Sequence, residues 1–165
     1  MRIFMSVMRA SIFLLPAAYL SIGCGGISTS TRPDGSPGPQ DCPSGALEAM
    51  LRLGIAVSER APINIDPARS DQVPLPLFEG PIESLLEDEL GPLPAGTRLY
   101  GRIWTGGPDV VIRYLEARPP RGQTIPFCGV AHDGSDGMTK RPDSPPGSGI
   151  IPDGAAIIRV VDAFR

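Results

Sequence analysis

Four side chains suited to ligand recognition lie at alternate positions near the middle of the 165-residue chain. A β-strand would place all of them on one face, and they are Arg98, Tyr100, Arg102 and Trp104. Aromatic rings beside guanidinium groups suit the binding of a sugar or a peptide. The alternative is that the rings pack on one layer of the domain without binding anything. We treat the four residues as a possible ligand-binding face.

A base, carboxylates and a hydroxyl group follow one another in residues 132–137, His-Asp-Gly-Ser-Asp-Gly. A Ser/His/Asp triad needs groups that converge in space, which neighbours in one loop rarely do. A calcium loop of the EF-hand type needs oxygen ligands at its first, third and fifth positions, and Gly137 would stand at the fifth. The pattern indicates a solvated turn. A small hydrolase using His132 with an acid of residues 133–136 is the alternative.

Metal and cofactor sites have little support in the sequence. Glu83 and Glu87 would lie one turn apart on a helix and could hold a weak cation, although a solvated helix face is the simpler interpretation. The single histidine and the absence of a Cys-x-x-Cys motif argue against zinc. The sequence also has no P-loop and no glycine-rich phosphate loop. We expect no metal and no cofactor.

Residues 1–23 have the layout of a lipoprotein signal peptide. A basic start is followed by an apolar stretch that is densest at residues 10–22 and too short to span a bilayer. The small residues Ser21 and Gly23 precede Cys24, an arrangement that resembles the bacterial lipobox, in which the cysteine is acylated. An ordinary secretory signal cut near this point, with Cys24 free, is the alternative.

The sequence predicts an exported protein, anchored through lipid on Cys24 to the bacterial cell envelope. Gly25 rather than Asp follows the cysteine, which favours transport to the outer membrane. Residues 24–41 contain one aliphatic residue among many Gly, Pro and Ser, so they are expected to form a flexible tether. The chain carries a net charge of −3 and no cluster of Lys and Arg along its length, which argues against nucleic acid as a partner.

Cys42 and Cys128 remain once Cys24 is set aside, and they form an even pair in an exported protein. We predict a disulfide between them, which would tie the start of the domain to its sheet. Closing so long a loop stabilises the fold by about 4–5 kcal/mol. Two separate buried thiols are the alternative.

Residues 42–165 are predicted to form one domain. Apolar spacing predicts helices at residues 44–53, which end at Gly54, and at residues 81–90, which begin with Pro81. Residues 132–154 are predicted to be a long polar loop. The strands are expected at 63–65, 73–78, 97–105, 110–118, 124–131 and 155–164. The expected fold class is α+β, mostly β: a small antiparallel meander, barrel-like or a sandwich, with one or two short helices packed on it.

Several short stretches also resemble a known group of proteins. They include Cys-Pro before the first helix, Pro-Ala-Gly-Thr-Arg-Leu-Tyr-Gly-Arg-Ile-Trp-Thr-Gly-Gly in the middle and a terminal Arg-Val-Val-Asp-Ala-Phe-Arg. Through these diffuse motifs, residues 42–165 are similar to uncharacterised lipoproteins of the myxobacterial type. Relatives of this kind are sometimes labelled serine/threonine protein kinases. The chain lacks the His-Arg-Asp and Asp-Phe-Gly triplets of kinases, so the resemblance implies no catalytic residue.

Two classes of function follow from these observations. The first is a non-enzymatic envelope lipoprotein that binds or scaffolds another component, an envelope protein or a glycan. The second is the small envelope hydrolase that uses His132. Catalysis would require His132 to lie within hydrogen-bonding reach of a partner at a concave site, so the surroundings of His132 discriminate between the two.

Overall fold

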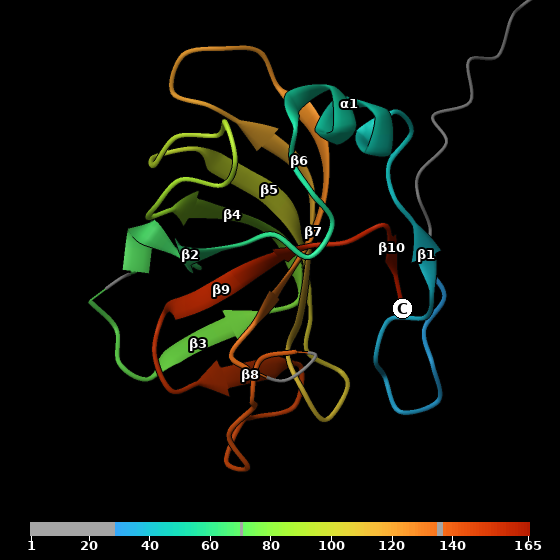
Figure 1. Ribbon diagram of the computed structural model, residues 1–165. Coiled ribbons are helices and arrows are strands. Elements are labelled where there is room, and N and C mark those ends of the chain that lie inside the picture. The colour runs from blue at the N-terminus through green and yellow to red at the C-terminus, as the bar shows by residue number, and fades with distance from the viewer. Residues whose placement is uncertain (1–28, 70, 135–136) are drawn as a thin grey trace, which may run out of the picture.

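A closed barrel of six antiparallel strands forms the body of the protein (Figure 1). The computed structural model describes residues 29–69, 71–134 and 137–165. In barrel order the strands are β2 (Arg60–Asn64), β4 (Gly80–Leu86), β5 (Arg98–Trp104), β6 (Val111–Arg118), β7 (Ile125–His132) and β9 (Ala155–Val160). The predicted class, mostly β with an antiparallel, barrel-like sheet, is confirmed.

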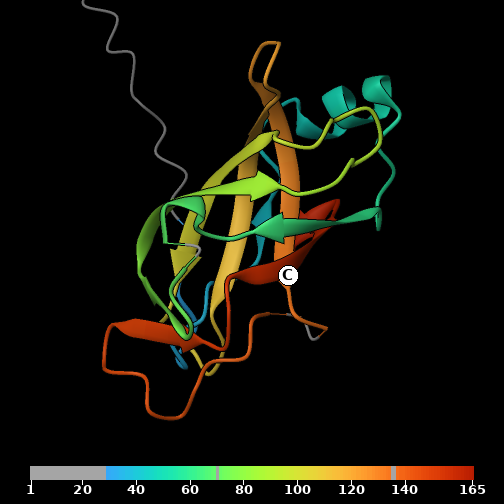
Figure 2. The same ribbon diagram turned by 90° about the vertical axis from the view of Figure 1, so that its left-hand side faces the viewer.

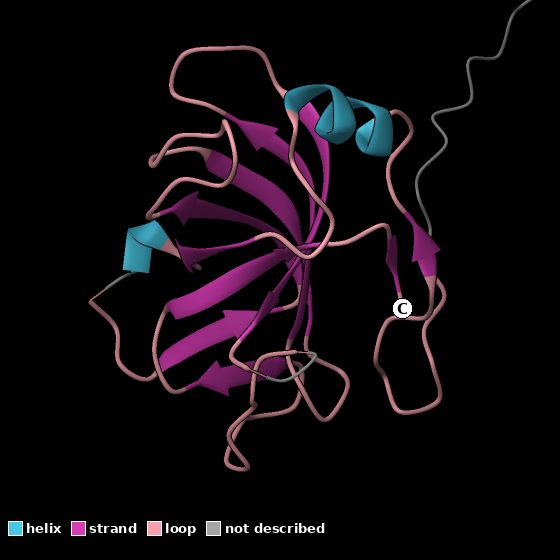
Figure 3. Ribbon diagram, viewed as in Figure 1, coloured by secondary structure: helices cyan, strands magenta, loops and turns pink. Residues whose placement is uncertain are grey.

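The remaining elements lie around this barrel. Helix α1 (Ala46–Leu53) packs on β7, and a short 3-10 helix, η1 (Pro67–Arg69), precedes the strand β3 (Leu75–Phe78). Strand β3 pairs with β8 (Ser148–Ile151), and β1 (Gln40–Asp41) pairs with β10 (Ala163–Phe164). Figures 1 and 2 place α1 and β8 toward opposite ends of the molecule, and Figure 3 shows how little of it is helical. Among the described residues, no helix is long and apolar enough to cross a membrane.

The barrel interior is apolar apart from one small polar network. Leu99, Ile112 and Phe127 are fully buried, as alternation along the strands requires. Ser84 donates a 2.6 Å hydrogen bond to the carbonyl of Ile65, and the hydroxyl of Tyr114 lies 2.7 Å from the Ser84 oxygen. Because the serine proton is committed to Ile65, Tyr114 is the donor in the second bond. Burial raises the pKa of Tyr114.

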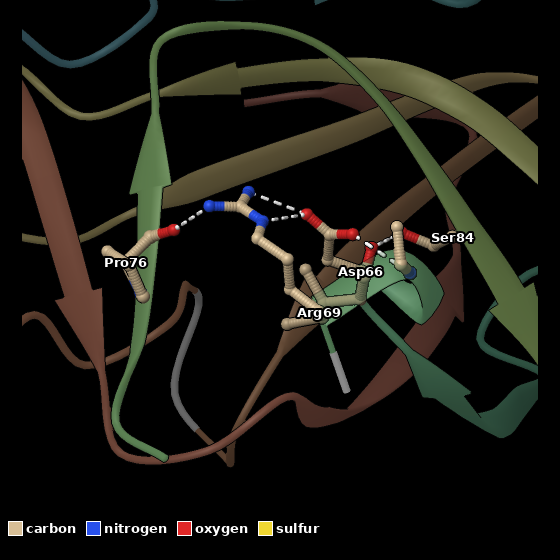
Figure 4. A network of polar contacts seen from close by, with 6 residues as sticks. Asp66, Arg69, Pro76 and Ser84 are labelled. Carbon is tan, nitrogen blue, oxygen red and sulfur yellow. Dashed lines mark hydrogen bonds and ion pairs between the residues drawn. The ribbon is translucent and has the colours of Figure 1, made fainter. Parts of the chain in front are cut away.

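Beside this network Arg69 of η1 forms an ion pair with Asp66 and a hydrogen bond to β3 (Figure 4). Arg69 donates to one carboxylate oxygen of Asp66 from Nε and Nη2, at 2.9 and 2.6 Å, and to the carbonyl of Pro76 from Nη1 at 2.9 Å. All three nitrogens of the guanidinium therefore donate to other groups of the chain, and we assign Arg69 a structural role.

Helix α1 begins two residues later than predicted and ends at Gly54, whose φ of 76° is the left-handed cap expected of a glycine. The buried face consists of Ala46, Ala49 and Met50. Leu47, Leu51 and Leu53 are exposed instead, so only part of the apolar spacing serves the core.

The second predicted helix, at residues 81–90, is wrong. These residues form most of β4 and the turn after it, and Ile82, Ser84 and Leu86 face inward at alternate positions. The spacing of the apolar residues fits both a helical repeat and the alternation of a strand. Six paired positions with β5 show that the segment is a strand. Glu83 and Glu87 consequently do not face each other across a helical turn.

Residues 29–41, which we call the N-terminal segment, differ from the predicted flexible tether. Thr31 pairs with Pro37, the amide of Gly38 donates to the carbonyl of Ser30 at 2.6 Å, and β1 follows directly. Pro37 and Gly38 are buried. Apart from three prolines the segment has no apolar side chains, and it is held through its main chain, which composition does not reveal. Residues 24–28 of the predicted tether, with Cys24, lie outside the described residues.

The predicted polar loop at 132–154 likewise contains β8, and the last predicted strand is divided into β9 and β10.

Candidate functional site

The four side chains predicted as a binding face lie on the outer face of β5. Leu99 and Ile103 are buried inside the barrel, and the residues between and beside them point outward. Arg98 forms an ion pair with Glu83, and Arg102 lies 3.8 Å from a carboxylate oxygen of Glu79. Both arginines therefore have an acidic neighbour at the surface.

Strand β6 brings two further arginines to this face. Arg118 stands directly opposite Arg98, and Arg113 directly opposite Arg102. Like charges in such positions destabilise a sheet. Aromatic rings offset part of the repulsion, because the Arg118 guanidinium lies 5.1 Å from the centre of the Tyr100 ring.

The ring of Trp104 likewise offsets the repulsion between the second pair of arginines, Arg102 and Arg113. The guanidinium carbons of Arg102 and Arg113 lie 5.7 and 5.4 Å from the centre of its ring. Only 7 % of Trp104 is exposed, whereas Tyr100 is half-buried. The two rings therefore do not form one open groove, and Trp104 supports Arg113 rather than facing solvent.

A β-bulge makes both arginine pairs possible. The register between β5 and β6 shifts between Tyr100 and Gly101. A Cβ atom at Gly101 would overlap the carbonyl of Arg113, so only glycine allows this approach of the two backbones.

Arg113 fastens the N-terminal segment to the barrel. Its Nη1 donates to the carbonyl of Gly38 at 2.9 Å and to the side-chain oxygen of Gln40 at 3.4 Å, and its Nη2 donates to the carbonyl of Pro37 at 3.4 Å. The ring of Phe164 in β10 lies 5.1 Å from the guanidinium carbon. One side chain thus joins β6 to both ends of the described chain.

A cleft of about 580 Å³ opens between the N-terminal segment, the end of the chain and the outer face of the barrel. Three aspartates also border it, Asp34, Asp109 and Asp162. We call it the arginine cleft after the four arginines that line it, which are Arg32, Arg113, Arg159 and Arg165.

Two of the three aspartates that border the arginine cleft, Asp34 and Asp162, are engaged in local contacts. Asp162 lies 3.7 Å from a guanidinium nitrogen of Arg165. Asp34 accepts hydrogen bonds from the hydroxyl and the amide of Ser36, which hold the pKa of Asp34 below its ordinary value. The cleft therefore carries more positive than negative groups in a chain whose net charge is −3.

Arg113 is the cation at the base of the arginine cleft. It is 2 % exposed, and among the described residues no carboxylate forms an ion pair with it. Burial and, to a lesser extent, the nearby charge of Arg32 together lower the pKa of Arg113 to about 10. At neutral pH the guanidinium stays charged, and carbonyl oxygens and aromatic rings are its neighbours.

His132 lies at a different place, at the end of β7. It is buried and borders a pocket of about 370 Å³ together with Asp133, Asp153 and Glu87. Its Nδ1 accepts a 3.2 Å hydrogen bond from the amide of Gly134, so in the neutral imidazole the proton is on Nε2. A triad histidine has the opposite arrangement, in which Nδ1 donates to an acid and Nε2 accepts.

The predicted disulfide between Cys42 and Cys128 is confirmed, with the two Cα atoms 5.5 Å apart. Cys24 lies outside the described residues. Within the described part of the chain, no group of three His, Cys, Asp or Glu side chains is placed to hold a metal ion.

Sequence reasoning missed the arginines that matter most. These arginines are far apart in the sequence and come together only through strand pairing. Arg113 and Arg159 both pair with Val130 of β7, from opposite sides. Arg60 of β2 pairs with Arg159. A signal was present, because two predicted strands of one hairpin each carried two arginines.

Comparisons of the chain with models of protein families, with curated proteins and with solved structures find no significant match, so the site has to be interpreted from its own geometry.

Proposed function

We propose that the chain is an envelope lipoprotein, held to the membrane by acyl chains on Cys24, whose barrel is a non-enzymatic domain that binds an anionic ligand in the arginine cleft. The observation that carries this proposal is the burial of Arg113 at the base of an open cleft without an acidic partner. A buried charge that lacks a counter-charge is costly. A carboxylate or phosphate group in the cleft would offset that cost.

The chemistry of the arginine cleft favours a small anionic group. Guanidinium groups bind carboxylates and phosphates through charge-assisted hydrogen bonds, often in pairs. The volume lies within the range of small-molecule sites. We assign the ligand to the acidic sugars of an envelope glycan, since exported domains near a membrane meet carboxylated and phosphorylated sugars there.

The hydrolase alternative receives less support from the site of His132. The hydrogen bond from Gly134 to Nδ1 leaves Nε2 protonated in the neutral ring, whereas a general base would need a free lone pair on that atom.

Calorimetric titration with galacturonate, inorganic phosphate and glucose tests the ligand proposal. We expect the two anions to bind and glucose not to bind. Arg32→Gln and Arg165→Gln replace exposed residues of the arginine cleft and should each weaken anion binding about tenfold, as loss of a charge-assisted hydrogen bond does.

The matched control is Arg121→Gln, an exposed arginine that lies outside the arginine cleft. Equal weakening by the control, or equal binding of glucose and galacturonate, contradicts the proposed site.

The anchor is tested separately by the intact mass of the membrane-bound protein. We expect a chain that begins at Cys24 and carries acyl groups, and a Cys24→Ser chain that lacks them. A mature protein that begins at any other residue rules out the anchor.

A further inference from the structure

An apolar surface is exposed on helix α1. Two large hydrophobic side chains of this helix, one turn apart, face solvent, and we call them the leucine patch: Leu47 and Leu51. Leu51 is 80 % exposed and Leu47, one turn earlier, 47 %. Because Ala46, Ala49 and Met50 hold the helix against the barrel, the leucine patch points away from it. Contiguous exposed apolar surface is typical of an interaction site.

A second apolar surface lies at the end of the helix. Leu53, on the barrel side of α1, borders a groove of about 520 Å³ in which Arg121 is the single charged residue. The other residues of the groove are Pro92, Leu93, Pro94, Pro119 and Pro120, from two loops at the end of the barrel near α1 (Figures 1 and 2), and Ile125 at the start of β7.

The N-terminal segment enters the fold beside this surface. Residues 29–31 run antiparallel to residues 37–40, and the hydroxyl of Thr29 donates to the side-chain oxygen of Gln40 at 2.7 Å. From Gln40 the chain passes through Cys42 directly into α1. Thr29, the first described residue, therefore lies at the open end of this hairpin, next to Gln40, from which the chain continues into α1.

The distance from the proposed anchor is short. Cys24 precedes Thr29 by five residues, which span at most about 17 Å when fully extended. Since residues 29–41 pack against the barrel, they add no reach. A membrane that holds acyl chains on Cys24 is thus kept within a short distance of α1.

We propose that the leucine patch inserts into the lipid interface of the membrane that holds Cys24, so that the domain has a second, non-covalent membrane contact; this inference rests on the acylation proposed above. A helix with apolar residues on one face and charged residues beside them lies in the plane of the interface. Arg121 at the groove is placed to meet anionic headgroups, and Arg52 in the last turn forms an ion pair with Glu48 on the exposed side of the helix. The short connection raises the effective concentration of lipid at the helix, which favours the membrane over a protein partner from solution.

The test uses the full-length acylated protein in vesicles of phosphatidylethanolamine and phosphatidylglycerol that contain a phospholipid with brominated acyl chains. An environment-sensitive fluorophore is attached at Leu51→Cys. The control is Val73→Cys, another exposed hydrophobic position, which lies in the loop before β3. The native cysteines are in the disulfide or acylated, so the added thiol is the labelled one.

We expect the label at position 51 to shift to shorter wavelength and to be quenched at least twofold more strongly by the brominated lipid than the label at position 73. Equal quenching at the two positions overturns the inference. A label at position 51 that stays unquenched on vesicle-bound protein also overturns it, and in that case the anchor stands. A chain that carries no acyl group and does not float with the vesicles overturns the anchor and, with it, the reason for placing lipid against α1.

Discussion

The guanidinium of Arg113 donates a hydrogen bond of 2.9 Å to the main-chain carbonyl of Gly38, 75 positions earlier in the sequence. Both residues are buried. Through this contact a segment whose apolar side chains are prolines alone becomes part of the domain, because a charged donor in the barrel wall satisfies the carbonyls that the segment brings with it.

Replacing Arg113 by Met should release the N-terminal segment while the barrel stays folded. The substitution leaves the carbonyls of Pro37 and Gly38 without this donor, at a cost of about 1–3 kcal/mol. We expect faster hydrogen exchange at the amides of Gly35 and Gly38 and a red shift in the emission of Trp104, the single tryptophan. Arg118→Met, the same change in the same strand, should alter neither; unchanged exchange in the Arg113 variant would contradict the assigned role.

Removing the disulfide should weaken the fold far more than a surface substitution. The bridge between Cys42 and Cys128 spans 86 positions, and loop closure of that length stabilises by about 4–5 kcal/mol. Urea unfolding of the Cys42→Ser, Cys128→Ser protein, compared with the oxidised and the reduced parent, measures the difference. The reduced parent should match the double variant, and a midpoint unaffected by reduction would oppose this expectation.

Tyr114→Phe should change how stability depends on pH. Because burial raises the pKa of Tyr114, the folded chain keeps this proton at pH values where the unfolded chain has lost it. This contribution is fully present below about pH 10, the ordinary tyrosine pKa, and falls above it by up to about 1.4 kcal/mol per pH unit.

The Tyr114→Phe protein does not lose this contribution to its stability above about pH 10, because phenylalanine does not titrate. At neutral pH it should be less stable by about 1 kcal/mol, since the hydrogen bond to Ser84 is gone. Its deficit should shrink as the pH rises above about 10. Urea unfolding of both proteins across this range checks the sign, and a constant difference would speak against it.

Gly101→Ala should destabilise the barrel by about 1–3 kcal/mol, as overpacking does. The new methyl group would overlap the carbonyl of Arg113, and backbone atoms cannot move aside as a flexible side chain can. Thermal unfolding gives the magnitude. If the alanine protein unfolds at the same temperature as the parent, the bulge tolerates a Cβ atom and our account of it is wrong.

The sequence predicted those elements that local signals define. Helix α1 was found because Gly54 marks its end, and the hairpin of β5 and β6 because a Gly/Asp-bearing turn joins two β-rich runs. The spacing of apolar residues in β4 fits a helix as well as a strand, so it predicts a helix, and pairing with β5 is a long-range property that local spacing does not show.

The candidate site was harder to predict for a related reason. Arg98, Tyr100, Arg102 and Trp104 share a face because alternation is local. Which arginine stands opposite depends on register, and a bulge at Gly101 sets that register. The docking of residues 29–41 depends on Arg113, a residue from the middle of the chain.

The bridge from Cys42 to Cys128 also defines a route for mechanical force. Tension that enters along the N-terminal segment passes through the sulfur atoms into β7, so the covalent loop between the two cysteines is bypassed. Strand β7 lies between β6 and β9, which carry Arg113 and Arg159 of the arginine cleft. In the proposed state, with Cys24 anchored and an anion in the arginine cleft, a pull on the ligand would draw on a few neighbouring strands and one covalent bond, while α1 and the strands β2 to β5 remain outside the direct line of load.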